Sequence, residues 1–283
     1  MLQQINSQLD ASVNFVEQQL TGFIESRYVR RQENYFIAYL SSQTGCNRGC
    51  QMCHLTATKQ TQFTNLDLLD FVSQFETVLA HYEKHTPAKT VHLNFMARGE
   101  PLANPTVLNT GSELLWKLGN IALERGLRPK FNISTIMPVT LKKSLCDVFP
   151  IIWPTVYYSI YSVNSSFRNK WLPAAMPVER ALDNLREYQQ ISKKIVKFHC
   201  AFIQDENDSE QDVERMLRLI QSYGFHSEFN IVRYNPYSDL QGQESSRVSD
   251  IADQIQHYMP CKIIPRVGVD CKASCGQFVP SSL

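Results

Sequence analysis

The chain has 283 residues, a formal net charge of +1 and 43% hydrophobic residues, a composition typical of a globular protein. The near-zero charge excludes a global basic field of the kind that attracts nucleic acid, although a local patch at Arg27, Arg30 and Arg31 would fit that role, as would a solvated loop. No apolar run is long enough to span a membrane and no secretory signal opens the sequence, so we expect a cytoplasmic monomer that binds no membrane.

Hydrophobic periodicity predicts a mixed α/β fold. A short amphipathic helix is expected over 7–24, because apolar residues recur there at helical spacing. Strands are then expected over 35–42, 90–96, 130–135, 155–161, 196–203 and 229–235. Helices are expected between them over 65–84, 105–124, 140–148, 177–192 and 209–222.

This alternation of strands and helices favours a parallel sheet, and six strands predict a partial (β/α)6 TIM-like barrel. We expect 1–24 to form an N-terminal helical extension and 25–283 to form the barrel core. The tail, 260–283, is expected to be a loop that contributes to catalysis. In such barrels, functional residues follow the carboxyl ends of the strands.

Eight cysteines occur in a chain without a signal sequence, which favours metal binding or catalysis over disulfides. Cys46, Cys50 and Cys53 follow the first expected strand with the spacing Cys-x3-Cys-x2-Cys. Three thiolates suit a [4Fe–4S] cluster with one open iron. Zinc would need a fourth ligand, for which His54 is a poor choice because it adjoins Cys53. Three unrelated buried cysteines remain the simplest alternative.

Several later segments place polar groups at strand ends. Gly99 and Glu100 follow the second expected strand, where glycine permits close backbone approach and the carboxylate can pair with an amino group. The other strand-end candidates for a ligand contact are Ser134, Ser159, Tyr161 and Asn235. Each of these could equally be a turn or capping residue. Cys275 precedes Gly276 in the tail, where a thiol could reach the barrel mouth or lie inert in the core.

Taken together, the segments SSQTGCNRGCQMC, ARGEPLAN, NIST, SIYSVNSSFRNKWLP, NPY and CKASCGQ resemble the RlmN/Cfr family of radical S-adenosylmethionine (SAM) RNA methyltransferases. The resemblance spans about residues 22–278 and implies a radical-SAM barrel with one [4Fe–4S] cluster on Cys46, Cys50 and Cys53. It also implies that SAM contacts Gly99, Glu100, Ser134, Ser159, Tyr161 and Asn235.

In that family, a first SAM methylates a tail cysteine, which matches Cys275. A radical made from a second SAM activates the methyl group, which then adds to an adenosine carbon of rRNA or tRNA. Glu25 resembles the family's acidic active-site residue, with one residue inserted in the spacing. The resemblance further implies an electron donor such as flavodoxin or ferredoxin.

The sequence departs from the family where a resolving cysteine is expected, because Tyr39 stands there. A phenol cannot form the disulfide that releases the product. Cys271 or an external thiol could take that role. Alternatively, the enzyme acts on a small or non-RNA substrate, with Cys275 as a radical or hydrogen-atom relay. A zinc- or cluster-bearing binding module without catalysis is the non-enzymatic alternative.

Overall fold

The fold is built on one curved sheet, which we describe from a computed structural model of residues 2–280. Its ten strands follow the chain order from β1 to β10. The strands are β1 (Leu2–Asn6), β2 (Val13–Gln18), β3 (Phe23–Gln32), β4 (Tyr35–Tyr39), β5 (Thr90–Phe95), β6 (Arg128–Thr135), β7 (Thr155–Ser159), β8 (Val196–Cys200), β9 (Ser227–Val232) and β10 (Cys261–Ile264). Strands β1 to β4 pair antiparallel, and β4 to β10 pair parallel.

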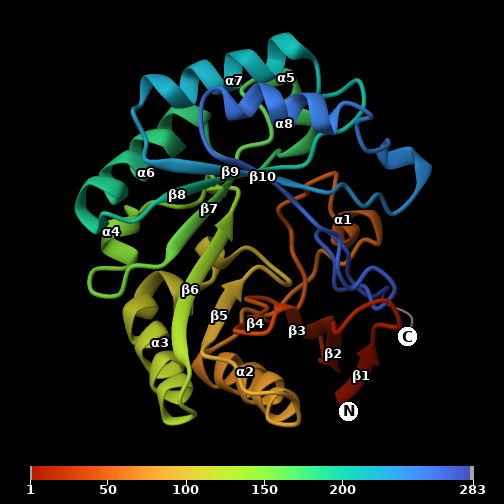
Figure 1. Cartoon of the computed structure of the whole chain (residues 1–283), viewed down its shortest axis with the longest axis vertical. Coiled ribbons are helices and arrows are strands. Elements are labelled where there is room, and N and C mark those ends of the chain that lie inside the picture. The colour runs from red at the N-terminus through yellow and green to blue at the C-terminus, as the bar shows by residue number, and fades with distance from the viewer. Residues whose placement is uncertain (1, 281–283) are drawn as a thin grey trace.

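Helices cover the outer side of the parallel strands, as Figure 1 shows. They are α1 (His54–Ala57), α2 (Leu68–Tyr82), α3 (Pro105–Glu124), α4 (Leu145–Val148), α5 (Ser165–Trp171), α6 (Val178–Ser192), α7 (Glu210–Ser222) and α8 (Val248–Gln256), with the 3-10 turns η1 (Pro101–Ala103) and η2 (Asp239–Gln241). Because β1 and β10 do not pair, the sheet is an open barrel. The predicted partial TIM-like barrel is therefore confirmed.

Most of the expected elements are present with small changes at their ends. All six expected strands form, as β4 to β9, and the five expected helices form as α2, α3, α4, α6 and α7. Residues next to the first turn of a helix determine where that helix begins. For example, Asp67 caps α2 by accepting hydrogen bonds from the backbone N–H groups of Leu69 and Asp70.

The expected N-terminal helix over 7–24 is wrong, because this segment forms β2 and the first two residues of β3. The four residues from Val13 to Val16 are all buried, which a strand covered on both faces permits. Leu9 and Leu20, which supported the helical pattern, are exposed. The segment is thus an extension of the sheet rather than a helical appendage.

The expectation of a loop throughout 260–283 is also wrong at its start. Residues 261–264 form β10, which adds a seventh parallel strand beside β9. Helix α8, which precedes β10, was not expected either. The rest of the tail up to residue 280 has no regular element, as predicted, while residues 281–283 lie outside the described part.

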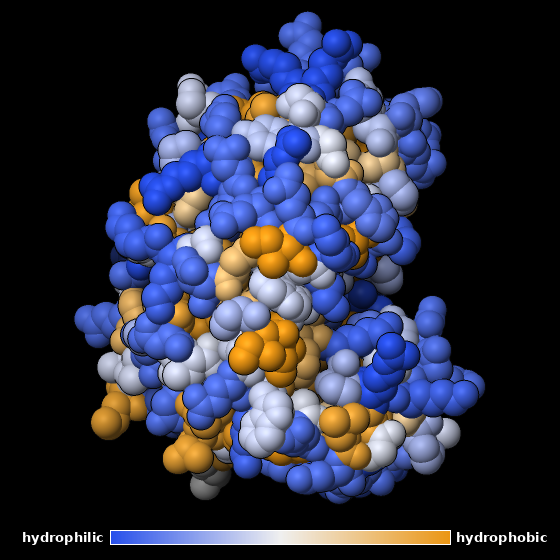
Figure 2. Space-filling model, turned by 90° about the vertical axis from the view of Figure 1, so that its left-hand side faces the viewer, coloured by the Kyte–Doolittle hydropathy of each residue, from blue (hydrophilic) through white to orange (hydrophobic). Residues whose placement is uncertain are grey.

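The main core lies between the parallel strands and the outer helices. Fully buried aromatic and aliphatic side chains fill it, among them Phe36, Phe71, Leu118, Phe198 and Leu217. The outer face of the helices is largely hydrophilic, with separate hydrophobic patches (Figure 2). No helix within residues 2–280 is long and apolar enough to cross a membrane.

Two leucines of α3 test this assignment of the core. Leu118 is fully buried, whereas Leu123 is 60% exposed on the same helix. Leu118→Ala should lower the free energy of unfolding by about 2–5 kcal/mol, because it removes packed methyl groups and leaves a cavity. The matched control Leu123→Ala should change it by less than about 0.5 kcal/mol. Urea unfolding measures both, and equal effects would contradict the assignment.

Candidate active site at the open end of the barrel

The three-cysteine loop lies between β4 and α1 and forms one wall of a cavity of about 160 Å³. Cys46, Cys50 and Cys53 all line this first cavity and are partly buried. Backbone hydrogen bonds fix the loop at both sides, since the Cys46 N–H donates to the Gln60 carbonyl (3.1 Å) and the Gln51 N–H donates to the Trp171 carbonyl (3.0 Å). The thiols therefore converge on a wall whose backbone is held in place.

Burial raises the pKa of all three thiols. That of Cys46 rises to about 12, and those of Cys50 and Cys53 rise above their ordinary value of 9.0. Loss of hydration is the largest cause, and repulsion among the thiolates adds to it for Cys46 and Cys50. A bound metal cation reverses this preference, because it is the largest local charge in such a site and takes thiols as thiolates.

The geometry of the thiols fits a cluster better than a single ion. Within residues 2–280, no three His, Cys, Asp or Glu side chains are grouped closely enough for one metal ion. His54 is not directed at the first cavity, since its Nε2 lies 3.0 Å from the Asn235 carbonyl. A cluster of several irons spaces its thiolates farther apart than one zinc does, so three thiols around an open cavity suit an iron–sulfur cluster.

Gly99 and Glu100 face the same cavity from the loop after β5. Gly99 has φ +93°, and a Cβ there would lie 2.6 Å from the Ser42 Oγ, so only glycine fits. The Glu100 carboxylate accepts hydrogen bonds from the backbone N–H groups of Leu102 (3.0 Å) and Ile136 (3.1 Å). Burial nevertheless raises its pKa. The structure thus brings a buried carboxylate beside the thiols, which is suited to an amino group.

A second cavity, of about 390 Å³, fills the barrel interior and shares Ser159, Tyr161 and Gly276 with the first. Ser134 also lines it, with its Oγ 3.5 Å from that of Ser159. Tyr161 has φ +55°, an uncommon conformation for a tyrosine that is often found at functional sites. These expected contact residues are therefore grouped at one place.

Asn235 differs from the other expected contact residues, because it lines neither cavity. Its Nδ2 donates to the Cys275 carbonyl (3.0 Å) and to the Ser274 Oγ (3.2 Å), and its Oδ1 accepts from the Arg266 Nε (3.0 Å). Asn235 thus holds the tail, and the expected direct contact with SAM has no support from its position.

Cys275 lies where the two cavities meet. Its side chain is exposed to the second cavity, and the neighbouring Gly276 carbonyl accepts a hydrogen bond from the His54 N–H (3.0 Å), which links the tail to α1. Partial loss of hydration beside the surrounding protein atoms is the largest cause that raises the pKa of the Cys275 thiol, to about 11. Cys271 is buried elsewhere, with its Sγ 3.5 Å from the Gly268 carbonyl, and lines neither cavity. It is therefore poorly placed to resolve a bond at Cys275.

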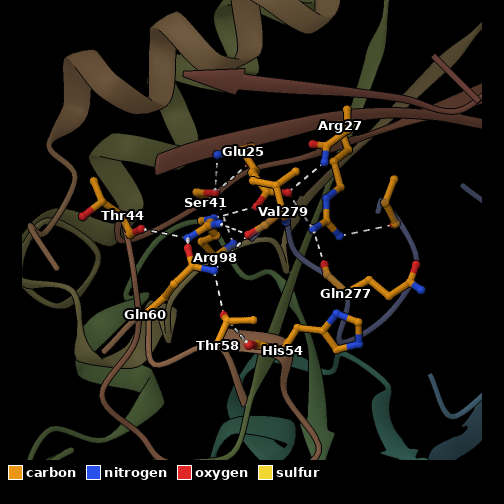
Figure 3. A network of polar contacts seen from close by, with 12 residues as sticks. Glu25, Arg27, Ser41, Thr44, His54, Thr58, Gln60, Arg98, Gln277 and Val279 are labelled. Atoms are coloured by element: carbon orange, nitrogen blue, oxygen red, sulfur yellow. Dashed lines mark hydrogen bonds and ion pairs between the residues drawn. The ribbon is translucent and has the colours of Figure 1, made fainter. Parts of the chain in front are cut away.

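Glu25 is fully buried in an ion-pair network and lines neither cavity (Figure 3). One carboxylate oxygen accepts from the Arg98 Nε (2.6 Å) and the Val279 N–H (3.1 Å), and the other accepts from Arg27 (3.2 Å). Arg27 also donates to the Gln277 carbonyl (2.7 Å). The position of Glu25 supports an anchoring role for the tail and gives no support to the expected role in catalysis.

Arg98 completes the network and was missed by sequence reasoning. Its remaining N–H groups donate to the carbonyls of Thr44 (3.1 Å) and Val279 (3.1 Å) and to the Gln60 Oε1 (2.8 Å). It thereby joins the cluster loop to the tail. The available signal was a lone arginine directly before Gly-Glu-Pro, in a segment that is otherwise apolar.

No protein-family model matches the sequence. Among curated proteins, the "Probable dual-specificity RNA methyltransferase RlmN" of Spiroplasma citri is 26% identical over 276 residues, which cover 95% of this chain and 76% of that protein. The "Dual-specificity RNA methyltransferase RlmN" of Campylobacter concisus is 27% identical over 263 residues, covering 89% and 65%. The chain thus spans about two thirds to three quarters of these relatives.

Two solved structures share the fold. A radical SAM methyltransferase from Sphaerobacter thermophilus superposes with a TM-score of 0.78 at 19% identity, covering 98% of this chain and 80% of that one. Streptococcus suis SuiB, solved with S-adenosylmethionine, gives a TM-score of 0.58 at 12% identity, covering 82% and 51%. At these identities the two structures bear on the fold alone.

The open barrel of parallel strands, with three cysteines in the loop after its first parallel strand, is similar in fold to a solved radical SAM methyltransferase. In sequence, the chain is similar to the curated RlmN proteins, as the resemblance predicted.

The ion-pair network predicts a large effect of Arg98→Met. The change removes the 2.6 Å ion pair of the buried Glu25 carboxylate, so the free energy of unfolding should fall by about 3–5 kcal/mol. Proteolysis within 265–280 should also become faster. The control Arg218→Met removes an exposed ion pair with Glu214 and should change little. Equal stability of the two variants would contradict the anchoring role.

The barrel interior predicts a dependence of stability on pH. Burial lowers the pKa of His92 to about 4 and that of His199 to about 3. Both are neutral in the folded state at pH 7, so their contribution is complete above about pH 6.5 and is lost as pH falls toward 4, where the unfolded chain binds the protons. His199→Asn should therefore lose less thermal stability between pH 7 and pH 5 than wild type does. The control is His226→Asn, because His226 is exposed. If His226→Asn reduced the loss of thermal stability between pH 7 and pH 5 as much as His199→Asn does, the prediction would be contradicted.

Proposed function

We propose that this chain is a radical-SAM methyltransferase that methylates an adenosine carbon in RNA through a methylcysteine at Cys275. The single observation that carries the proposal is that Cys275 lines the second cavity where it meets the cavity of the three cluster thiols. The RlmN names of the curated relatives support the RNA substrate. A cytoplasmic location, a monomeric state and a flavodoxin- or ferredoxin-type electron donor stay predictions.

Cys46, Cys50 and Cys53 would hold one [4Fe–4S] cluster, and Gly99 and Glu100 would receive the methionyl end of SAM. When bound, the cluster supplies the electron that cleaves SAM into methionine and a 5′-deoxyadenosyl radical. Ser134, Ser159 and Tyr161 would contact the remainder of SAM, because they line the adjoining cavity.

The work of Cys275 divides into three steps. First, its sulfur takes the methyl group of one SAM, its proton goes to solvent and S-adenosylhomocysteine leaves. Second, the methyl group on Cys275 would lose one hydrogen atom to the radical that SAM cleavage supplies, and the carbon radical left on Cys275 would add to an adenine carbon. The adduct would then lose one proton and one electron, which would return the electron supplied for SAM cleavage. Third, a thiolate attacks the Cys275 sulfur, so that a disulfide forms and the released carbon takes a proton.

The third step requires a second thiol that the described residues do not place at the site. Tyr39 lines the second cavity where a resolving cysteine was expected, and Cys275 is the only cysteine among the residues lining that cavity between positions 2 and 280. We therefore assign resolution to an external thiol. The same observation favours the second candidate function, a radical-SAM enzyme for a small or non-RNA substrate with Cys275 as a radical or hydrogen-atom relay.

The test uses anaerobically reconstituted protein with SAM, a low-potential reductant, dithiothreitol as the external thiol and a pool of unmodified RNA. We expect methylated adenosine in the digested RNA and 5′-deoxyadenosine in solution, both found by mass spectrometry. Cys50→Ala should abolish both products, because it removes a proposed cluster ligand. Cys275→Ala should abolish the methylated base while the cluster absorption remains.

The two candidate functions give different results. SAM cleavage without a methylated base on any RNA supplied would exclude RNA methylation and favour the small-substrate alternative. Bound zinc or a bound cluster without SAM cleavage would instead indicate the zinc- or cluster-bearing binding module.

A further inference from the structure

The interior of the barrel is more basic than the chain as a whole. Six cationic side chains line the second cavity, and no Asp or Glu side chain lines it: the cations are Arg27, Arg31, Lys197, Arg233, Lys262 and Arg266. The whole chain has a net charge of only +1. Positive charge is therefore concentrated in a concave site, which raises the local concentration of anions.

Three carboxylates outside the lining form ion pairs with five of these cations. Glu25 pairs with Arg27. Glu228 pairs with Lys197 and Lys262, at 3.0 and 3.6 Å. Glu244 pairs with Arg233 and Arg266. Each of the last two carboxylates is shared by two cations, so the lining keeps an excess of positive charge even after every pair is counted.

Arg31 is the sixth cation and has no partner. Within residues 2–280 it makes no hydrogen bond and no ion pair, and its Nε is buried without a partner. Arg31 is only partly buried, and its terminal N–H groups make no hydrogen bond within the described residues. A ligand in the cavity can therefore supply an anion to it, and a guanidinium matches phosphate oxygens with two parallel N–H donors.

The position of Arg31 follows from the alternation of side chains along β3. Arg27 and Arg31 are four residues apart and both line the cavity, as the regular alternation of a strand requires. Arg30 donates to the Thr86 carbonyl (2.6 Å), away from the cavity, whereas Arg31 lines it. Because adjacent residues of a strand point to opposite faces, Arg30 is bound outside the cavity while Arg31 lines it.

Neutral polar groups line the second cavity together with Arg31 and Cys275. The amides of Asn94 and Asn132 lie in the lining and are joined by a 2.7 Å hydrogen bond. Such amides can read the edge of a purine, and aromatic side chains such as Tyr39 can stack on its face. Phosphate-binding charge, amide edges and aromatic faces in one cavity are the combination that a nucleotide requires.

We propose that the second cavity, besides receiving the remainder of SAM at Ser134, Ser159 and Tyr161, binds the substrate as a single nucleotide. A phosphate group of this nucleotide would lie on Arg31 and its base beside Cys275. This inference rests on the proposed function for the identity of the base, but the phosphate site follows from the cavity alone. The phosphate can belong to a free nucleotide or to one nucleotide inserted from an RNA strand. In both cases, recognition occurs within the barrel and needs no extended basic surface.

The test measures binding rather than turnover. Isothermal titration of the reconstituted holoenzyme compares adenosine, adenosine 5′-monophosphate and a five-nucleotide oligoadenylate at one salt concentration. The monophosphate or the oligonucleotide should bind at least about tenfold more tightly than adenosine, because a charged hydrogen bond to arginine forms. Arg31→Gln should remove that advantage and leave the affinity for adenosine unchanged.

The control is Arg218→Gln, which removes one exposed cation on α7 and keeps the same net charge as Arg31→Gln. It should leave all three affinities unchanged. Because the Arg31 side chain makes no hydrogen bond or ion pair within the described residues, Arg31→Gln should also leave the melting temperature unchanged or raise it, whereas a structural arginine would lower it. If the affinity for adenosine 5′-monophosphate depends on Arg31, a free nucleotide is sufficient for binding. If only the affinity for the oligonucleotide depends on Arg31, the phosphate comes from an RNA strand.

The proposal is overturned if neither phosphorylated ligand loses affinity in Arg31→Gln, or if Arg218→Gln causes the same loss. Its failure is separable from that of the proposed function. If phosphate binding depends on Arg31 but no RNA is methylated, the phosphate site stands and the proposed methylation is rejected. If RNA is methylated but Arg31→Gln binds the phosphorylated ligands as wild type does, the methylation stands and the phosphate site is rejected.

Discussion

The buried ion pair between Arg98 and Glu25 is the interaction on which the site depends. Arg98 follows β5, Glu25 lies in β3, and their side chains meet at 2.6 Å with no solvent exposure. The same guanidinium binds carbonyls of the cluster loop and of the tail. Three segments far apart in sequence are thereby fixed around one side chain, and Cys275 is carried by the tail that this side chain holds.

Burying these charges is costly, and the network offsets the cost by satisfying nearly every donor. Arg98 uses Nε, Nη1 and Nη2, and both Glu25 oxygens accept at least two hydrogen bonds. Phe278 covers the network, with its ring 4.8 Å from the Arg27 guanidinium. An apolar contact would hold the tail less specifically, because hydrogen bonds to the Gln277 and Val279 carbonyls also fix its register.

Sequence reasoning predicted the parallel half of the barrel well and its antiparallel edge poorly. Strands β4 to β9 bury apolar side chains against helices, so their patterns are clear. Strand β3 reads FIESRYVRRQ, and its charged residues were not recognised as part of a strand. Their partners lie up to 254 residues away, at the tail, and no local pattern reveals such contacts.

The motifs of the candidate site were predictable because each lies within one loop. The three cysteines and Gly99-Glu100 needed only local spacing and strand ends, and the structure brings them to one cavity. The roles of Glu25 and Asn235 were less accessible. Both are polar residues near the site, but only the fold reveals that they bind the tail instead of lining a cavity.

The most direct test of this account is the mass of the tail peptide that contains Cys275, taken from reduced, reconstituted protein after incubation with SAM in the absence of RNA. Fragmentation of the peptide locates any modification. The account predicts one added methyl group on the Cys275 sulfur and none on Cys271, which is buried away from both cavities. An unmodified Cys275 in protein that cleaves SAM, or a methyl group on Cys271 instead, would contradict it.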